Sequence, residues 1–331
     1  AILDDSFKKI PNNMSLIFTY NRLSFRKIPW VIQVEWVCTP LGYDIKLLKK
    51  YRRVLERLFA SDYCKGILTW SEPAKKSILL NLNCAKFEHK IRVIFQTVQK
   101  KDFTKIYSNS DDEVRLLFVG SASRVQYFEQ KGGRLALEVF SVLSRKYDDL
   151  KLVIRAKVPQ HIKNEFDIEG NPKVKLIEEE LSWKSLEREF TSADIFVYPT
   201  YELQNTVILD AMSYELPIVT TDFGSNGWID DGMTGFVVET SKEVPYFCEN
   251  LIPTGITSQR NLVTEAIQKP APKLVERVAE KVSILIENPE LRQRMGKAAR
   301  CEVEEGKFAI RKRNEKLKRI FDEAIAGTFG K

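Results

Sequence analysis

The segment "DIFVYPTYELQNTVILDAMSYELPIVTT" (residues 194–221) decides the fold of this chain. Two apolar stretches, 194–200 and 217–221, flank a short helical pattern that begins near Asn205 or Thr206, and both residues are common helix N-caps. Apolar strands that alternate with helices indicate a parallel sheet that is buried on both faces. The loop after the first strand therefore lies at the carboxyl edge of the sheet, where such sheets bind ligands.

The same alternation continues on both sides of this segment. It predicts further strands at 114–120, 150–155, 173–179 and 235–239, and an earlier group at 15–20, 30–36, 65–70 and 90–98. We therefore expect an α/β protein with two parallel-sheet domains. Their predicted bounds are 1–108 for a short N-terminal domain, 109–113 for a linker, 114–300 for the C-terminal domain, and 301–331 for a last helix that packs back on the first domain.

Charge is divided unevenly between the two domains. The net charge is +7, but residues 1–108 carry +11 and the remainder carries −4. The first domain therefore favours a phosphate-bearing or membrane-surface partner, and charge alone leaves nucleic acid open. No apolar run has the length of a membrane span, and the first residues have no export signal. Five scattered cysteines and two distant histidines indicate reduced thiols, a cytoplasmic protein and no metal centre.

Two acids, Glu202 and Asp210, stand on either side of the start of the helix in the first segment. The free N–H groups at this helix start favour an anion such as phosphate. A carboxylate near such a site is suited to accept hydrogen bonds from hydroxyl groups attached to the anion, as in a nucleotide sugar. Alternatively, Glu202 is a solvated loop acid and Asp210 is a surface acid of the helix.

A second segment, "LLFVGSASRVQYFEQKGGRLALEVF" (116–140), leaves a strand at Gly120 and enters a helix at Gly132. Lys131 precedes this helix, where its charge opposes the helix dipole, so its position makes better sense if an anion lies between them. Arg124 in the same loop could supply a second cation. The short motif "KGG" is weak evidence alone.

Taken together, these segments resemble the retaining GT-B glycosyltransferases of the large "group 1" type, which is similar to family 4. The resemblance rests on "KGG", "ADIFVYPTYE", the acid pair and "LPIVTTDFGSNGWIDDGMTGFVV", and it covers residues 114–240 best. It implies a GT-B fold, with two Rossmann-like domains facing a cleft. It also implies a retaining hexosyltransferase-type enzyme that uses a nucleotide-sugar donor such as a UDP-, GDP- or ADP-sugar.

The resemblance assigns roles to particular residues. Lys131 matches the lysine that contacts the donor diphosphate, and Arg124 matches its partner arginine in a loop that is longer than usual. Glu202 matches the acid near the donor sugar, and Asp210 stands where a glutamate on the nucleotide ribose is expected. The other residues expected at the donor are Gly120, Gly132, Asn205, Thr206 and Val207.

The mechanism that the resemblance implies needs no metal or other cofactor. An acceptor oxygen attacks the anomeric carbon on the face from which the nucleotide leaves, and the anomeric configuration is retained. Lys131, Arg124 and the helix start would stabilise the charge on the departing diphosphate. The sequence contains no D-x-D motif, which is the metal–diphosphate signature of the other main glycosyltransferase fold.

The N-terminal domain departs from the family pattern. A strand and a glycine-rich loop usually open this domain, whereas residues 1–14 contain no glycine. We therefore expect either that the beginning of the domain is missing from the sequence or that the acceptor side is reduced. Glu35 stands where many relatives have a histidine that touches the donor sugar. Alternatively, Glu35 is an acid that closes a strand beside Trp36.

The basic helix predicted at 44–60 has two interpretations. It could lie on an anionic membrane and bring the enzyme, as a peripheral protein, to a lipid-linked or other glycan acceptor. Alternatively, its apolar stripe covers the sheet and its cations face water. A non-catalytic nucleotide-sugar-binding or partner module is the main alternative to an enzyme. A basic nucleic-acid-binding protein is less favoured, and no nucleic acid is expected, because no known module is present.

Overall fold

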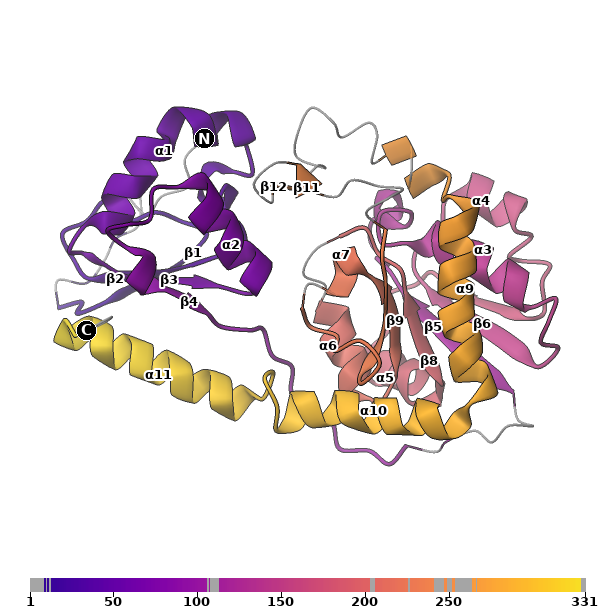
Figure 1. Cartoon of the computed structure of the whole chain (residues 1–331). Coiled ribbons are helices and arrows are strands. Elements are labelled where there is room, and N and C mark those ends of the chain that lie inside the picture. Colours follow the sequence, from indigo (N-terminus) through magenta and orange to yellow (C-terminus); the bar gives the residue numbers. More distant parts are fainter. Residues whose placement is uncertain are drawn as a thin grey trace. The chain divides into compact units, whose positions relative to one another are not determined.

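The computed structural model describes residues 9, 11, 13–105, 107, 113–202, 206–225, 227–240, 247–248, 252–253, 264–265 and 267–328. Asn205 and most of the expected 109–113 linker lie outside this set. The chain divides into two compact units (Figure 1). Unit 1 comprises Ala1–Gln96, Phe247–Arg260 and Ile310–Lys331, and unit 2 comprises Thr97–Tyr246 and Asn261–Ala309.

Unit 1 contains a four-stranded parallel sheet with the order β1-β2-β3-β4. Its strands are β1 (Ile17–Tyr20), β2 (Trp30–Val34), β3 (Cys64–Thr69) and β4 (Ile91–Val93). Its helices are α1 (Ile45–Ala60), α2 (Glu72–Asn81) and α11 (Ile310–Ala326), with short 3-10 turns at Thr39–Leu41 and Glu88–Lys90. The strands alternate with helices, as a parallel sheet requires.

Helix α1 begins where the sequence predicts it. The Asp44 side chain caps it by accepting hydrogen bonds from the N–H groups of Lys46 and Leu47. The apolar residues Leu48, Leu55 and Phe59 are buried, whereas the basic residues of the other faces are exposed. Burial of this stripe, rather than helix propensity alone, holds a helix of this length on the sheet.

Helix α11 returns from the end of the chain to the sheet of unit 1. Its residues Ile320 and Ala324 form an apolar cluster with Val31, Leu68 and Ile94 of that sheet region. The cluster is almost fully buried. The last helix is therefore part of the core of unit 1, although it is far from that core in sequence.

Unit 2 contains a six-stranded parallel sheet with the order β10-β9-β8-β5-β6-β7. The strands are β5 (Val114–Val119), β6 (Leu150–Arg155), β7 (Val174–Ile177), β8 (Ile195–Tyr198), β9 (Ile218–Thr221) and β10 (Gly235–Val238). The helices include α3 (Gly133–Leu143), α4 (Gln160–Glu165), α5 (Trp183–Ser192), α6 (Thr206–Ser213), α7 (Asp222–Ser225), α9 (Pro272–Glu287) and α10 (Pro289–Glu304). A 3-10 turn spans Val125–Tyr127. The short strands β11 (Phe247–Cys248) and β12 (Ile252–Pro253), which pair antiparallel, belong to unit 1.

The predicted fold class is confirmed, because each of the two sheets is parallel. Several strands are shorter than the apolar patterns from which they were predicted. The pattern at 90–98 forms a strand only at Ile91–Val93, and the pattern at 30–36 ends as a strand at Val34. These excess residues are buried or half-buried without pairing as strands, and apolar periodicity cannot distinguish the two situations.

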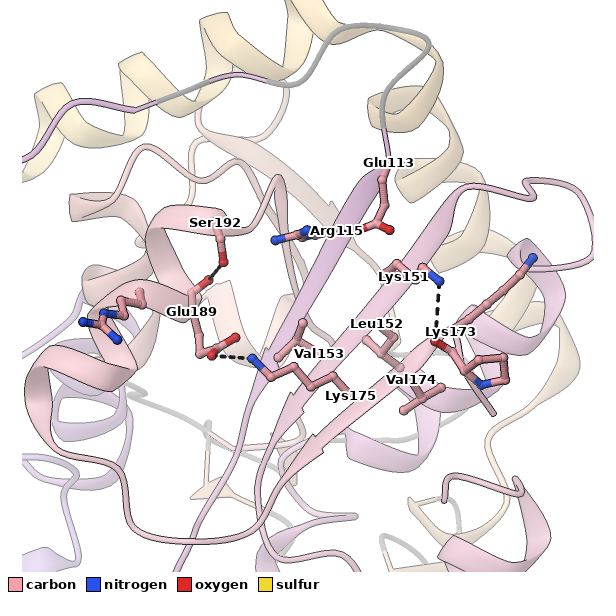
Figure 2. Close-up of a pocket in the computed structure, with 12 residues that line it drawn as sticks. Glu113, Arg115, Lys151, Leu152, Val153, Lys173, Val174, Lys175, Glu189 and Ser192 are labelled. Carbon is pink, nitrogen blue, oxygen red and sulfur yellow. Dashed lines mark hydrogen bonds and ion pairs between the residues drawn. The ribbon is translucent and has the colours of Figure 1, made fainter. Parts of the chain in front are cut away.

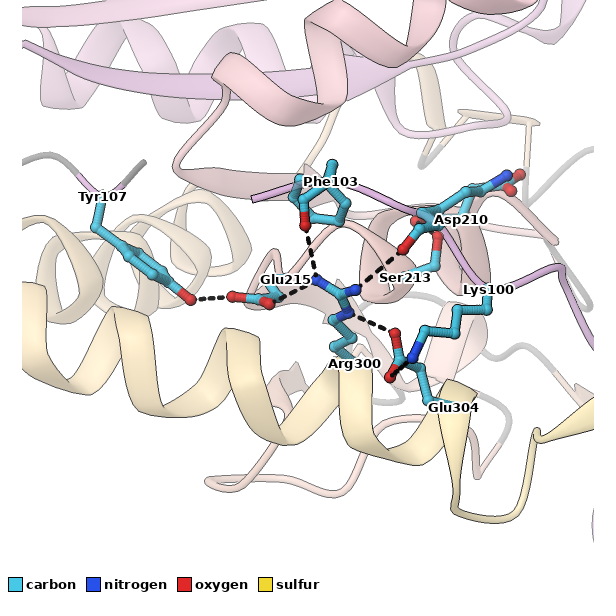
Figure 3. A network of polar contacts seen from close by, with 9 residues as sticks. Lys100, Phe103, Tyr107, Asp210, Ser213, Glu215, Arg300 and Glu304 are labelled. Carbon is cyan, nitrogen blue, oxygen red and sulfur yellow. Dashed lines mark hydrogen bonds and ion pairs between the residues drawn. The ribbon is translucent and has the colours of Figure 1, made fainter. Parts of the chain in front are cut away.

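The start of unit 2 is fastened to its last helices by a polar network (Figure 3). The Arg300 guanidinium of α10 donates to the carbonyl oxygens of Lys101 and Phe103 at 3.0 and 3.5 Å, and it pairs with Glu215 and Glu304 at 2.9 and 2.6 Å. The chain that leads from Gln96 toward β5 is therefore held by charge-assisted hydrogen bonds.

Candidate active site

Two loops of unit 2 meet at the carboxyl edge of its sheet. Strands β5 and β8 are paired neighbours, with Leu116 opposite Ile195 and Leu117 opposite Phe196. The loop after β5 leads into α3, and the loop after β8 leads into α6. Two helix N-termini therefore begin at neighbouring strand ends, which is the usual ligand position in such sheets.

A close backbone approach joins these two loops. Gly132 has φ +82°, and a β-carbon at this position would lie 2.2 Å from the carbonyl oxygen of Pro199. Both the left-handed conformation and the lack of space therefore require glycine. The Tyr201 N–H also donates to the carbonyl oxygen of Gln130 at 3.0 Å. These contacts hold the residue before α3 against the residue that follows β8.

The result is an ion pair between Lys131 and Glu202. The Lys131 Nζ atom lies 2.8 Å from Glu202 Oε2, with side chains that are 21% and 18% exposed. Lys131 Nζ also lies 3.4 Å from the hydroxyl of Tyr198, the last residue of β8. Burial, and secondarily the charge of Glu202, raises the pKa of Tyr198, so its hydroxyl stays protonated at neutral pH.

Partly exposed charges of opposite sign suit a site that must bind an anion next to hydroxyl groups. The Lys131 ammonium group has three N–H donors, so it can contact Glu202, the Tyr198 hydroxyl and a further acceptor. Glu202 is acceptor-only when ionised and can receive hydroxyl groups. Its position is set by its own N–H, which donates to Thr200 Oγ1 at 3.0 Å. The pair therefore brings a cation and a hydroxyl acceptor to one point.

The helix starts contribute unequally to this point. The N–H groups of Gly132 and Gly133 already donate to the carbonyl oxygens of Glu129 and Phe128, at 2.8 and 2.9 Å. Gly132 thus positions Lys131, and its own amide is occupied. Helix α6 begins at Thr206, which is exposed, followed by the half-buried Val207. Asn205, the expected N-cap, lies outside the described residues.

Two other predicted residues have local structural contacts. The Gly120 N–H donates to the Arg155 carbonyl oxygen at 2.9 Å, so Gly120 continues the pairing of β5 with β6. Arg124 is exposed, and its guanidinium lies 3.1 Å from the Tyr127 hydroxyl. Among the described residues, the Arg124 side chain contacts Tyr127 rather than Lys131 or Glu202.

Asp210 lies on α6 beside the chain segment that begins unit 2 (Figure 3). Burial raises the pKa of its carboxyl to about 6, and the nearby charge of Lys101 opposes this shift. Asp210 is therefore a half-buried acid whose pKa is closer to neutral pH than that of an ordinary aspartate. Among the described residues, its contacts do not join it to the Lys131–Glu202 pair.

Glu35 lies at the carboxyl end of β2 in unit 1 within a polar cluster. Its carboxylate accepts hydrogen bonds from Tyr20, Tyr43 and Asn21, the last at 3.2 Å. Asn21 and Tyr43 have positive φ angles of 52° and 62°, which non-glycine residues rarely adopt. Strained residues of this kind often gather at ligand sites, and here two of them flank one carboxylate.

Beside this carboxylate, Tyr20 stacks on Trp70, with ring centroids 5.3 Å apart and an interplanar angle of 25°. Tyr20 and Tyr43 are 44% and 43% exposed. Exposed aromatic rings beside a hydrogen-bond acceptor form a surface that is both apolar and polar, as sugar rings are.

The described residues also bear on metal ions and membranes. Among the described residues, no group of three or more His, Cys, Asp or Glu side chains is arranged to hold a metal ion. No helix in the described part of the chain combines the length and the apolar character that crossing a membrane requires.

The sequence predicted Lys131 and Glu202 as donor-site residues. It did not predict the contacts that hold their two loops together. Tyr198 contacts Lys131, and Pro199 fixes the approach of Gly132. The signal for Tyr198 was present, because it alternates with Thr200 along an otherwise apolar strand end. The contact of Pro199 with Gly132 had no sequence signal, because it depends on which two strands are neighbours.

A family comparison agrees with this site. Residues 113–252 match the model of the family described as "Glycosyl transferases group 1". This range contains both loops of the site and all six strands of the unit 2 sheet. No curated protein sequence matches the chain.

Solved structures show the fold of the chain beyond this range. A variant of S. aureus TarM, solved with fondaparinux, α-GlcNAc-glycerol and UDP, is 14% identical with a TM-score of 0.59, covering 90% of this chain and 51% of that one. The sucrose-phosphate synthase of Thermosynechococcus elongatus is 13% identical with a TM-score of 0.62, covering 94% and 74%. Anabaena HepE, solved with UDP and glucose, is 12% identical with a TM-score of 0.56, covering 93% and 77%.

The chain spans about half the length of the TarM structures that it matches. At these identities the likeness establishes the fold alone. The chain has the GT-B fold of two parallel-sheet α/β domains, and its unit 2 carries the match to group 1 glycosyl transferases.

Proposed function

We propose that this chain is a glycosyltransferase that transfers a sugar from a nucleotide-diphosphate-sugar donor to a glycan or lipid-linked acceptor. The observation that carries the proposal is the Lys131–Glu202 pair, at 2.8 Å, between two helix starts at the carboxyl edge of the unit 2 sheet. The group 1 family match over residues 113–252 supports it. The nucleotide sugar is a substrate, and no cofactor is required.

In this proposal, the donor diphosphate accepts hydrogen bonds from the Lys131 ammonium group. The donor sugar presents its hydroxyl groups to Glu202. The acceptor oxygen bonds to the anomeric carbon as the bond from that carbon to the diphosphate oxygen breaks, and the proton of the acceptor hydroxyl passes to the departing diphosphate. Negative charge then accumulates on the departing diphosphate, where Lys131 and the α6 start stabilise it. Arg124 can add a second cation after turning away from Tyr127.

We further propose that the anomeric configuration is retained and that the chemistry requires no metal. Attack on the face from which the nucleotide leaves keeps the configuration, and fixed cations replace a metal at the diphosphate. Asp210 is proposed to accept a hydrogen bond from the ribose. With a pKa near 6, its carboxylate is ionised at neutral pH and can serve as that acceptor.

Unit 1 is proposed to serve the acceptor, which assigns Glu35 to an acceptor sugar instead of the donor sugar that the resemblance implies. The Tyr20–Trp70 stack gives a sugar ring an apolar surface, and Glu35 gives its hydroxyl groups an acceptor. Substitution Glu35→Gln would keep the size of the side chain while removing its charge. We expect it to raise the KM for the acceptor more than the KM for the donor. An equal effect on both would argue against this assignment.

The basic face of α1 is proposed to bring a cytoplasmic enzyme to an anionic membrane surface. Lys49, Lys50 and Arg53 are exposed, and each cation near such a surface contributes about 1 kcal/mol. Co-sedimentation with vesicles that contain phosphatidylserine tests this idea. The Lys49→Glu/Lys50→Glu variant should lose binding, and an unchanged bound fraction would reject the membrane role.

A donor panel tests the main proposal. Thermal unfolding is measured with UDP-, GDP- and ADP-sugars for the wild type, Lys131→Ala and Glu202→Ala, with Lys184→Ala as the matched control. Lys184 is an exposed lysine on α5. We expect one donor class to stabilise the wild type and the control, but neither of the two site variants.

Product analysis then separates an enzyme from a binding module. The stabilising donor is incubated with candidate acceptors, with and without EDTA, and the anomeric configuration of the product is read by NMR. Transfer with retention in EDTA supports the full proposal. Binding without transfer or donor hydrolysis would instead support the non-catalytic module, and an inverted product would refute retention.

A further inference from the structure

Unit 2 contains a cavity of about 400 Å³ at the amino ends of β5, β6 and β7, on the side where α5 packs (Figure 2). This edge of the sheet is opposite to the one that carries Lys131, because the strands are parallel. The cavity is therefore separate from the proposed donor site. Its volume lies in the range of small-molecule sites.

Cations dominate the side chains around this cavity. They come from the first residues of three strands and from α5: Arg115, Lys151, Lys173, Lys175 and Arg188. Two acids, Glu113 and Glu189, are the only carboxylates among the residues that line it. The lining therefore has an excess of three positive charges.

The strand register brings like charges together. Arg115 of β5 lies directly opposite Lys151 of β6, and Lys175 of β7 lies opposite Val153. Residues two apart on a strand share a face, so these cations point to the same side of the sheet. Like charges that face each other across neighbouring strands destabilise a sheet. The face of a sheet that a helix covers is more often apolar. An anion bound among these cations would relieve their mutual repulsion.

The two acids balance only part of this charge. Glu113 lies 2.7 Å from Arg115, and Glu189 lies 2.7 Å from Lys175. Lys151 Nζ has a backbone partner, the Pro172 carbonyl oxygen, at 3.4 Å. Among the described residues, neither Lys151 nor Arg188 has a carboxylate within ion-pair distance.

Apolar residues also line the cavity, namely Leu152, Val153, Val174 and Pro172, but Leu152 and Val153 are only 1% and 7% exposed. A ligand in this cavity therefore meets mainly the charged side chains.

We propose that this cavity binds a small polyanion, meaning a molecule with two or more phosphate or carboxylate groups. Lys151 and Arg188 are its principal contacts, because they have no competing carboxylate. Arg115, Lys173 and Lys175 add to the field that attracts it. The cavity lies on the opposite edge of the sheet from Lys131, so binding here does not depend on the proposed function.

Isothermal titration calorimetry with citrate and with pyrophosphate tests this proposal. The titrations use the Lys131→Ala protein as background, so that binding at the proposed donor site is removed. Into this background we introduce Lys151→Gln and Arg188→Gln separately, and Lys184→Gln as a control on the same helix as Arg188. Thermal unfolding without ligand verifies that each variant is folded, and the two cavity variants provide independent tests.

We expect each cavity variant to weaken binding of both anions about tenfold, because each removes one charge-assisted contact. The control should bind as the background does. Equal affinity in all of the proteins would overturn the proposal. So would a stronger, salt-sensitive binding of a single-stranded DNA oligonucleotide that also depends on Lys151 and Arg188, because it would assign the surface to nucleic acid.

Discussion

The two edges of the six-stranded sheet differ in the balance between cations and carboxylates. At the carboxyl edge, Lys131 is matched with Glu202, and both side chains are about four-fifths buried. At the amino edge, five cations face two acids around an open cavity. A cation alone therefore does not define a site, because its partners determine which ligand it can bind. A matched pair suits an anion joined to hydroxyl groups, whereas an excess of cations suits a polyanion.

The geometry of the carboxyl edge depends most strongly on Gly132. We expect Gly132→Ala to lower the free energy of unfolding by about 3 kcal/mol or more, because the added β-carbon would meet the Pro199 carbonyl in a left-handed conformation. Urea unfolding measures this. Gly232→Ala is the matched control, since Gly232 has φ +76° and open space around it, and it should cost about 1 kcal/mol. Equal costs would show that the loop contact is unimportant.

The chemistry of that edge depends on Lys131. We expect Lys131→Ala to lower kcat roughly 100-fold, because the charge on the departing diphosphate loses its main cation. Initial rates with the identified donor and acceptor measure this effect, and Lys184→Ala should remain at the wild-type rate. A kcat within twofold of the wild type would place the cationic group elsewhere.

Asp210 sharpens the comparison because, among the described residues, it has a cation nearby, Lys101, but none within ion-pair distance. Its pKa of about 6 lies above the usual value for aspartate, near 4, so the folded state holds a proton more tightly than the unfolded state. The free energy of unfolding therefore falls as pH rises through this window. We expect Asp210→Asn to gain roughly 2 kcal/mol relative to the wild type between about pH 4 and pH 7.5.

Chemical unfolding across this pH range measures the difference, with Asp148→Asn as the control at a fully exposed carboxylate. A relative stability that does not change with pH would contradict the buried, near-neutral state of Asp210. The same variant should bind the donor less tightly at neutral pH if Asp210 accepts a ribose hydroxyl.

The smallest effect is expected at the amino edge. Lys151→Gln removes one member of the like-charged pair with Arg115, so the free energy of unfolding should rise by about 0.3 kcal/mol at low salt. The gain should disappear in about 1 M salt, because screening removes the repulsion. Denaturant midpoints at both salt concentrations measure it, against Lys184→Gln. A loss of stability at low salt would mean that Lys151 is a structural cation.

The sequence predicted the fold class, because parallel-sheet strands read as apolar runs, and the structure confirms it. It predicted Lys131 and Glu202 as donor-site residues through the family resemblance, and that role stays a prediction. Strand order was not readable, so the closeness of Pro199 to Gly132 and the opposition of Arg115 to Lys151 could not be predicted. Both depend on register between strands that are distant in sequence.

Asp210 illustrates another limit. Its spacing from Glu202 indicates that the two acids lie on the same side of the start of α6. In the structure Asp210 lies near Lys101, which precedes the sheet of unit 2 in the chain. Similarly, Glu35 was recognised as an acid that closes a strand, whereas its partners come from two other segments, Tyr20 with Asn21 and, farther along the chain, Tyr43. Helical and strand periodicity gives no information on such partners.

The central claim is that Lys131 binds the diphosphate of a nucleotide donor at the carboxyl edge. The most direct measurement is a calorimetric titration of UDP, GDP and ADP into the wild type, Lys131→Ala and Lys151→Gln. We predict that one nucleotide has a high-affinity site that is the same in the wild type and Lys151→Gln, and that Lys131→Ala weakens this site at least tenfold. Unchanged affinity in Lys131→Ala, or a loss confined to Lys151→Gln, would contradict it.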